Sequence, residues 1–294
     1  MRTLSQIGEI AGKKILVRDD FNVTMDENGK IQDDFKIRAS LPTIEHLLKN
    51  QARIILMAHL GRPLEHESIR DLTDKDQRKK FSLRPIAERL SALLNKEVIL
   101  APDCIGPEAE NLAASLKKGE ILLLENLRFH KDEDDNNDDF AKKLSLLGEI
   151  YINDAFGNSH REDASMEAIV KHLPSFGGFL LHKEVEALSR IRQNPERPLA
   201  VIIGGAKIST KIKLIKEFLD KADNLMLGGA LANTVLGAKG LAIGKSLIEE
   251  NIFPEVKKME ITNPKLHIPV DVILSEDKNG QAENRVRSEE RREG

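Results

Sequence analysis

The stretch "PLAVIIGGAKISTK" at residues 198–211 most directly decides the fold. Its apolar run is typical of a buried strand, and two glycines then open a segment with helical character, which together predict one βα unit of a parallel sheet. Glycines let a backbone approach a ligand closely, and free amides at a helix N-terminus attract phosphate oxygens. Since Lys207 and Lys211 are four residues apart, we expect them to share one helix face. The stretch therefore predicts a phosphate site at Gly204 and Gly205.

Apolar runs of the same kind recur along the chain and alternate with amphipathic segments. The runs are apolar on both faces, which is typical of parallel strands covered by helices on both sides. The strand candidates are residues 14–18, 53–58, 97–100, 120–125, 149–153, 199–204, 224–228 and 267–274, and helical periodicity marks 41–50, 84–95 and 140–148. The pattern predicts an α/β fold with two doubly wound, Rossmann-like parallel-sheet domains.

A long polar helical pattern at residues 180–198 ends in prolines and separates five strand candidates from the remaining three. We interpret it as an interdomain helix. The charged end of the chain has almost no apolar residues after Leu274, so we expect it to be disordered. The predicted organisation is an N-terminal domain at 1–178, a hinge helix at 179–197, an incomplete second domain at 198–275 and a disordered tail at 276–294.

Composition restricts the classes of protein that this chain can belong to. The 294 residues are 40% hydrophobic, which suffices for a buried core. The 45 basic and 48 acidic residues give a net charge of −3, which does not suggest a nucleic-acid partner. Cys104 is the only cysteine and fits a reducing compartment, and no apolar run approaches the ~20 residues that span a bilayer. We expect a cytoplasmic protein without a membrane or nucleic-acid partner.

Polar side chains follow four strand candidates of the first half. Ligands of open α/β sheets bind beyond the carboxyl ends of the strands, and arginine binds carboxylates and phosphates in a bidentate manner. One such residue alone is more often a surface ion pair, but several at one edge predict a site for a small polyanion. The residues are Arg18, Asp20 and Asn22; His59, Gly61 and Arg62; Asn126 and Arg128; and Asp154, Gly157, His160 and Arg161.

The second half has a further glycine turn at Gly228 and Gly229. The segment "AKGLAIGKS" (238–246) lacks the glycine spacing of a P-loop, and the acidic run at 132–139 is better explained by a helix start than by a calcium loop. Without an H-E-x-x-H or a paired C-x-x-C motif, the sequence predicts no metal site in the protein itself. A polyanion site in one half and a phosphate site in the other suit direct phosphoryl transfer.

The motifs "VRDDFNV", "HLGRP", "LLLENLRFH", "DAFGNSHR", "GGAKISTK" and "GKSLIEEN" occur in this order. From about residue 5 to about residue 275 the chain resembles phosphoglycerate kinases. The resemblance implies a hinged, monomeric enzyme of glycolysis and gluconeogenesis that transfers a phosphoryl group between 1,3-bisphosphoglycerate and ADP. The products are 3-phosphoglycerate and ATP, and Mg²⁺ is bound together with the nucleotide.

The resemblance also implies roles for individual residues. Lys36 and Lys211 would be the catalytic residues, and the anion cluster of the first domain would face the turn from Gly204 to Lys211 in the second. The residues that would hold phosphoglycerate are Asp20, Asn22, Lys36, His59, Arg62, Arg128, His160 and Arg161. Those that would bind the nucleotide are Gly204, Gly205, Lys207, Lys211, Gly228 and Gly229.

The chain departs from the family pattern in several places. Lys36 replaces a catalytic arginine and loses the guanidinium fork, Asp19 replaces an apolar residue at a strand end, and Ala230 replaces a turn glycine. The family's W-N-G-P-x-G motif and its G-G-G-D-[ST] loop, whose aspartate helps to hold the magnesium nucleotide, have no counterpart, which predicts a C-terminally truncated member. The alternatives are a non-catalytic phosphoglycerate-binding remnant, an incomplete translation product, and an unrelated binding protein in which Arg128 and Arg161 lie far apart.

Overall fold

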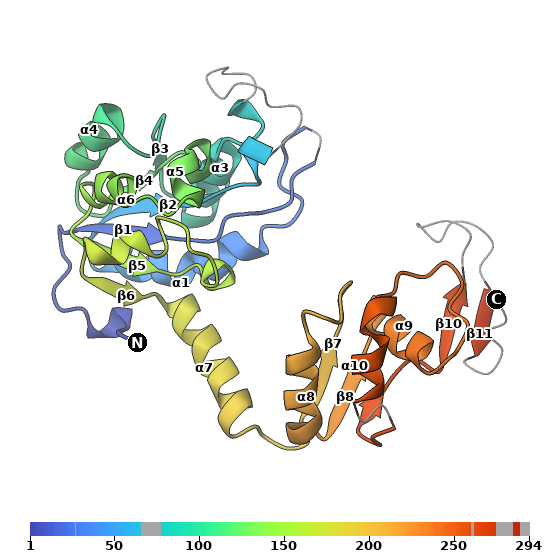
Figure 1. The fold of residues 1–294 in the computed structure, drawn as a ribbon. Helices are drawn as coiled ribbons and strands as arrows, with labels where there is room; N and C mark the ends of the chain where they lie inside the picture. The colour runs from blue at the N-terminus through green and yellow to red at the C-terminus, as the bar shows by residue number, and fades with distance from the viewer. Residues whose placement is uncertain (27, 66–77, 260–261, 275–284, 289–294) are drawn as a thin grey trace. The chain divides into compact units, whose positions relative to one another are not determined.

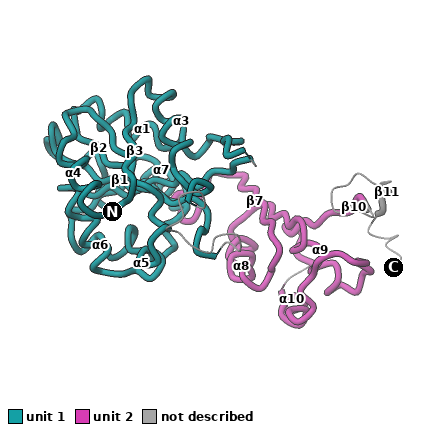
Figure 2. Tube along the Cα trace, turned by 90° about the horizontal axis from the view of Figure 1, so that it is seen from above, with its two compact units in different colours: residues 1–189 teal, residues 190–294 magenta. Residues whose placement is uncertain are grey.

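The structure is a computed structural model that describes residues 1–26, 28–65, 78–259, 262–274 and 285–288. The chain forms two compact units, Met1–Ser189 and Arg190–Gly294 (Figure 2). The boundary between them falls within helix α7 (Phe179–Gln193), which corresponds to the helix expected at 180–198. Among the described residues, no helix is long and apolar enough to cross a membrane.

Unit 1 is built on a six-stranded sheet in the order β3-β4-β2-β1-β5-β6 (Figure 1). All five strand pairs are parallel, so the carboxyl ends of the strands meet at one edge of the sheet. The strands are β1 (Lys14–Arg18), β2 (Arg53–Met57), β3 (Val98–Leu100), β4 (Ile121–Leu123), β5 (Ile150–Asn153) and β6 (Ser175–Gly177). Five of them match expected runs, whereas the short "SFG" of β6 carried too few apolar residues to be predicted.

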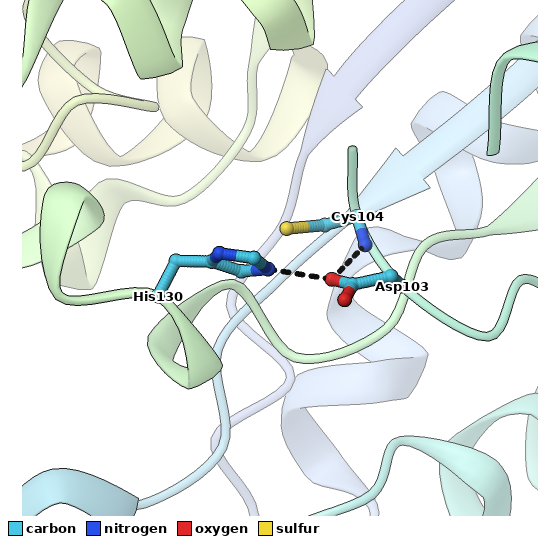
Figure 3. Close-up of side chains that lie close together, drawn as sticks. All are labelled: Asp103, Cys104 and His130. Atoms are coloured by element: carbon cyan, nitrogen blue, oxygen red, sulfur yellow. Dashed lines mark hydrogen bonds and ion pairs between the residues drawn. The ribbon is translucent and has the colours of Figure 1, made fainter. Parts of the chain in front are cut away.

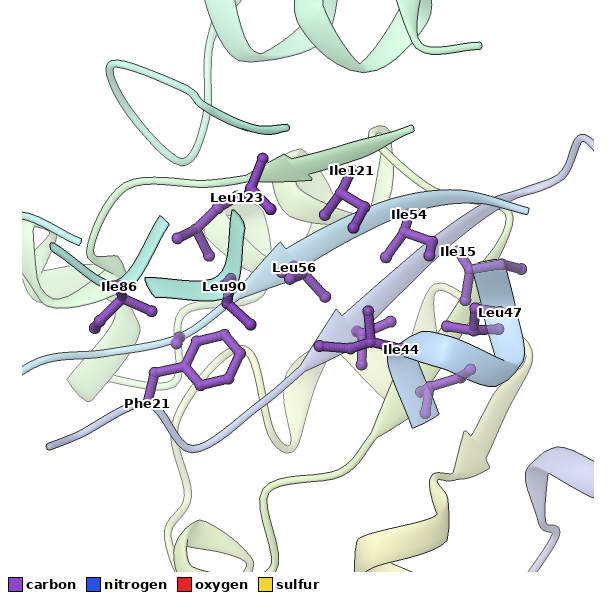
Figure 4. Packing of buried hydrophobic residues seen from close by; sticks show 14 of the residues in the cluster. Ile15, Phe21, Ile44, Leu47, Ile54, Leu56, Ile86, Leu90, Ile121 and Leu123 are labelled. Atoms are coloured by element: carbon purple, nitrogen blue, oxygen red, sulfur yellow. The ribbon is translucent and has the colours of Figure 1, made fainter. Parts of the chain in front are cut away.

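Helices cover both faces of this sheet. Ile54 and Leu56 of β2 point to one face, beside α1 and α3, whereas Ile55 and Met57 point to the other, beside α4 and α6. Figure 4 shows the first of these cores, with Ile44 and Leu47 of α1 and Leu90 of α3 packed against the strands. Besides α7, the α-helices among the described residues of this unit are α1 (Phe35–Lys49), α3 (Arg84–Leu94), α4 (Pro107–Ser115), α5 (Lys131–Asp134) and α6 (Asp138–Ser145).

Local sequence explains where most of these helices begin and end. Asn137 caps α6 by accepting a hydrogen bond from the Phe140 amide (3.0 Å), and α3 ends at Asn95 in the left-handed conformation. Helix α1 begins before the expected segment at 41–50, so Pro42 lies inside it. A proline inside a helix removes one backbone hydrogen bond. Helix α1 nevertheless buries Ile37, Ile44 and Leu47 in the core.

Unit 2 contains a three-stranded parallel sheet in the order β7-β8-β9. Its core lies on one face only, where Ile203 and Leu225 pack with α8, α9 and α10. On the other face Ile202 is 76% exposed and Met226 is 37% exposed. Within the described residues, the two-sided cover expected for parallel strands is therefore present in unit 1 and missing in unit 2. The elements are β7 (Ala200–Ile203), α8 (Ile212–Lys221), β8 (Asn224–Leu227), α9 (Gly229–Ala238), α10 (Phe253–Lys257) and β9 (Leu266–His267).

The strand expected at 267–274 is two strands in different sheets. Pro269 has no N–H to donate and lies between β9 and β10 (Asp271–Leu274). Strand β10 pairs antiparallel with β11 (Arg285–Ser288), so the expectation of a disordered tail is wrong for those four residues. Their ladder is made by backbone groups and does not require an apolar segment. The rest of the expected tail, at 276–284 and 289–294, lies outside the described residues.

Candidate active site

The loop after β2 is held by side chains from two neighbouring strand ends. The Gly61 amide donates to Asn22 Oδ1 (2.9 Å), and Arg128 Nη1 donates to the Gly61 carbonyl (2.8 Å). Gly61 has a φ of +61°, and a Cβ at this position would lie 2.5 Å from the Phe81 ring. Only glycine fits both conditions without strain. The loops after β1, β2 and β4 therefore form one connected structure.

Arg128 and Arg161 meet at a single carboxylate. Arg161 Nη2 donates to Asp134 Oδ1 (3.1 Å), and Arg128 Nε lies 3.3 Å from the same oxygen. Arg161 Nε also donates to Asp163 (2.8 Å), and this bond raises the pKa of Arg161, whereas burial lowers the pKa of Arg128. Two guanidinium groups from different loops thus lie at the same Asp134 carboxylate. The alternative of an unrelated protein with these arginines far apart is wrong.

His59 is buried and uncharged beside this pair. Burial, followed by the charges of Arg18, Arg128 and Arg161, lowers the pKa of His59 to about 2. Its Nδ1 lies 2.9 Å from Arg18 Nη2. Because a guanidinium can only donate, Nδ1 must accept, and the ring proton lies on Nε2. His59 therefore acts as a neutral hydrogen-bond donor within a strongly positive region.

Lys36 and Asp20 form an ion pair at the same edge. Lys36 Nζ lies 2.9 Å from Asp20 Oδ2, and Asp20 Oδ1 accepts from the Asn22 amide (3.1 Å). A Cβ at Gly157 would lie only 3.0 Å from Asp20 Oδ2, so the loop after β5 passes close to this carboxylate. Lys36 stands in the first turn of α1 and also contributes to the low pKa of His59.

The last two predicted residues of this set are more exposed. Arg62 Nη1 donates to Glu65 Oε2 (2.8 Å), and this bond lowers the pKa of Glu65. The charges of Arg128 and Arg161 lower it further, so this ion pair lies within reach of the guanidinium pair. His160 is exposed, and among the described residues no hydrogen bond or ion pair joins its ring to the cluster.

Sequence reasoning named Arg18 but missed the buried residues that hold it in place. Arg18 Nε donates to Ser165 Oγ (2.9 Å), Ser165 Oγ donates to Glu133, and the Tyr151 hydroxyl donates to the Ser165 carbonyl (2.8 Å). The acidic run at 132–139 lies partly in helix starts, as expected, but Glu133 and Asp134 also hold Ser165 and the two arginines. No sequence spacing could have connected the acidic run with Ser165.

Asp19 is a buried carboxylate without a hydrogen-bond partner. Both of its side-chain oxygens are unpaired among the described residues, and burial, followed by the charge of Asp154, raises its pKa. Asp154 lies at the end of β5 and accepts from the Leu181 amide in the first turn of α7 (3.0 Å). The expectation that a carboxylate fits poorly at position 19 is confirmed.

The glycine turn of unit 2 differs from the expected geometry. Helix α8 begins only at Ile212, with Lys211 at its N-cap position, and Lys207 lies in the preceding loop. The prediction that Lys207 and Lys211 share a helix face is therefore wrong. Ile208 is fully buried, and the Ser209 amide and hydroxyl donate to the Glu249 carboxylate (2.9 and 2.7 Å). These contacts hold the segment in a turn and delay the helix.

The two glycine turns of unit 2 approach each other. A Cβ at Gly205 would lie 3.0 Å from Lys211 Cε, so this lysine folds back over the turn. Gly229 has a φ of +60°, and a Cβ there would lie 3.9 Å from the Gly205 carbonyl oxygen. Gly228 is the N-cap of α9 and gives it no side-chain cap. Backbone amides and a lysine at one place suit phosphate oxygens.

The same residues do not suit a metal ion held by the protein. Glu249 already accepts two hydrogen bonds from Ser209, and these bonds lower its pKa. The other side chains at the turn are lysines, whose charge repels cations, and the free backbone N–H groups are donors that cannot bind a metal ion. Among the described residues, the one group of three or more potential metal ligands lies in unit 1.

The fold and the two sites define an α/β protein that handles small phosphorylated anions. A sequence model of the family described as phosphoglycerate kinase matches residues 4–293. A phosphoglycerate kinase of Aquifex aeolicus is 45% identical over 284 residues, which are 94% of this chain and 68% of that protein. A cytosolic phosphoglycerate kinase of Triticum aestivum is 46% identical, and the alignment covers 97% of this chain and 70% of that protein.

A solved structure shows the same likeness. Phosphoglycerate kinase from Coxiella burnetii aligns with a TM-score of 0.74 and 38% identity, covering 99% of this chain and 72% of that one. The chain belongs to the phosphoglycerate kinase family. The predicted family, its α/β fold and its function in glycolytic phosphoryl transfer are thereby confirmed, and the family consists of kinase enzymes. The cytoplasmic location and the domain limits stay predictions.

Proposed function

We propose that this chain itself transfers a phosphoryl group between 1,3-bisphosphoglycerate and ADP, giving 3-phosphoglycerate and ATP. The observation that carries the proposal is the meeting of Arg128 and Arg161 at Asp134 beside neutral His59. We further propose that the chain acts as a monomer and takes Mg²⁺ with its nucleotide.

The anionic groups of phosphoglycerate would bind where protein carboxylates now lie. Asp134 accepts a hydrogen bond from Arg161 and forms an ion pair with Arg128, and Glu65 accepts from Arg62. Guanidinium forks bind carboxylate and phosphate oxygens alike, so substrate oxygens can replace or share these contacts. His59 would donate from Nε2 without adding a charge. Asp20 and Asn22 would order the neighbouring loops, and exposed His160 would lie at the rim.

The nucleotide phosphates would bind in unit 2 at the turns of Gly204–Gly205 and Gly228–Gly229. The amides of the α9 N-terminus and the Lys211 ammonium would contact them, with Lys207 in the adjoining loop.

The chemistry needs positioning and charge neutralisation. A carboxylate oxygen of 3-phosphoglycerate forms a bond to the γ-phosphorus of ATP, and the bond from that phosphorus to the bridging oxygen of ADP breaks. The nucleophile is already a carboxylate, so no general base is needed. Lys211 and Lys36 would neutralise the transferring group. Lys36 supplies charge without a fork, so we expect slower transfer than in an otherwise equal chain with arginine there.

A coupled assay with 3-phosphoglycerate and MgATP tests catalysis by the whole chain. Loss of a preorganised transition-state contact lowers kcat by about 10²–10³. We expect Lys211→Ala to lose about 100-fold or more, whereas Lys213→Ala, which replaces an exposed lysine of α8, keeps the parent rate. Equal rates for the parent chain and Lys211→Ala would contradict the proposal. Phosphoglycerate binding without turnover would instead favour the non-catalytic remnant.

A further inference from the structure

Three potential metal ligands that take no part in the sites described above lie together in unit 1. Asp103 and Cys104 belong to the loop between β3 and α4, and His130 immediately precedes α5 (Figure 3). One ligand atom from each, a carboxylate oxygen, Cys104 Sγ and an imidazole nitrogen, lies within 4.8 Å of the other two. We propose that Asp103, Cys104 and His130 bind one Zn²⁺ ion, with water as the fourth ligand.

The distances require only small movements. Zn²⁺ bonds of about 2.0–2.3 Å in a tetrahedron place neighbouring ligand atoms roughly 3.5 Å apart. His130 Nε2 now lies 2.6 Å from Asp103 Oδ1, so this hydrogen bond would open by about 1 Å to admit the ion. The Cys104 amide donates to the same oxygen (2.7 Å), which keeps the carboxylate folded over its own loop. Ligands on two loops are thus already directed toward one point.

The negative charges around Cys104 disfavour a thiolate by itself and favour a bound cation. The Cys104 thiol is buried beside the carboxylate of Asp103. Negative charges that disfavour a thiolate attract a divalent cation, which would replace the thiol proton. The balance is one Zn²⁺ bound and one proton released, with no change of oxidation state. Arg78 opposes binding, because its Nη2 lies 3.6 Å from Asp103 Oδ2.

The chemistry of the ligands selects the metal. Thiolate and imidazole suit Zn²⁺, whereas Mg²⁺ prefers oxygen ligands and keeps its waters. The sequence predicted no such site because zinc motifs space their ligands closely, and here the fold joins two separate loops. The His172–Asp138 pair, with 3.1 Å between Nε2 and Oδ1, offers a natural comparison: it has the same imidazole and carboxylate, and the described residues place no thiol beside it.

Cobalt titration of the full chain tests the site, with Co²⁺ replacing Zn²⁺ as a coloured probe. A thiolate bound to Co²⁺ gives a near-ultraviolet charge-transfer band, and Cys104 is the only cysteine that could produce it. We expect the band to appear at saturation and to vanish when Zn²⁺ is added in equal amount. A large excess of Mg²⁺ should leave it in place.

Variants locate the remaining ligands. We expect His130→Gln and Asp103→Asn to weaken Zn²⁺ binding at least tenfold in competition with a chromophoric chelator, and His172→Gln to leave it unchanged. Absence of the cobalt band in the parent chain would overturn the proposal, and this measurement needs no variant that might misfold. Zn²⁺ affinity that is equal in Cys104→Ser and the parent chain would overturn it as well.

Discussion

The sheets of the two units have similar sequences and different surroundings. Strand β2 reads "RIILM" and β7 reads "AVII", yet Ile55 of β2 is fully buried whereas Ile202 of β7 is 76% exposed. Helices cover both faces of the first sheet and, among the described residues, one face of the second. Local sequence thus specifies a strand, but the segments packed against it determine what each side chain contributes to stability.

The unfolding of unit 1 can be followed separately by tyrosine fluorescence. Tyr151 is the only tyrosine, and the chain has no tryptophan. Tyr151 lies buried in β5, so tyrosine fluorescence reports the unfolding of unit 1 alone. Circular dichroism reports the helices of both units.

The largest effect should come from truncating isoleucine in each sheet. Ile55→Ala removes buried methyl groups and leaves a cavity, so we expect the free energy of unfolding of unit 1 to fall by about 2–5 kcal/mol. Ile202→Ala should change the free energy of unfolding of unit 2 by less than about 0.5 kcal/mol, because this side chain is already in water. Urea titrations followed by fluorescence and circular dichroism measure both. Equal losses would show that the face around Ile202 is covered in solution.

The second effect is a loss of stability of unit 1 in acid, caused by His59. The pKa of His59 is about 2 in the fold and about 6.5 in an unfolded chain, so the unfolded state binds more protons between these values. Stability from neutral His59 is complete above pH 6.5 and is lost as the pH falls toward 2. Between pH 7 and pH 5 the loss is about 2 kcal/mol. His59→Asn should remove this part of the acid sensitivity of unit 1, and His172→Asn should not. If the free energy of unfolding of His59→Asn fell between pH 7 and pH 5 as much as that of the parent chain, this explanation of the acid sensitivity would be wrong.

Asp19 should make stability depend on pH in the opposite direction to His59, and by a smaller amount. Its raised pKa means that the folded state binds the proton more tightly than the unfolded state. Stability is therefore greatest below about pH 4 and falls as the pH rises through the folded pKa. Asp19→Asn should raise the free energy of unfolding at pH 7 by about 1 kcal/mol, and by less near pH 4. The exposed Asp139→Asn is the control. Destabilisation by Asp19→Asn at pH 7 would mean that the carboxylate has a stabilising partner.

The smallest effect on stability should follow from a charge on the exposed sheet face. Ile202→Lys should change the free energy of unfolding of unit 2 by less than about 0.5 kcal/mol, because solvent reaches this position. It should also reduce binding of an apolar dye, since it interrupts the apolar surface of Ile202 and Met226. A loss of more than about 2 kcal/mol would indicate a buried face.

The sequence predicted those features that depend on local pattern. Apolar runs located β1 and β2 to within a residue, and polar residues after the strands identified the cluster around His59. Features that depend on distant contacts were not predictable. The buried side chain of Ile208 moves the start of α8 beyond Lys207, and the role of Asp134 depends on two arginines from other loops. The grouping of Cys104 with His130 likewise arises only when the loops after β3 and β4 meet.

Calorimetric titration of the full chain with 3-phosphoglycerate tests most directly that the strand-end loops of unit 1 form one anion site. The account predicts saturable binding at one site per chain, weakened at least tenfold by Arg128→Gln and unchanged by Arg84→Gln, an exposed arginine on α3. Absence of binding, or equal affinity in Arg128→Gln and the parent chain, would contradict it.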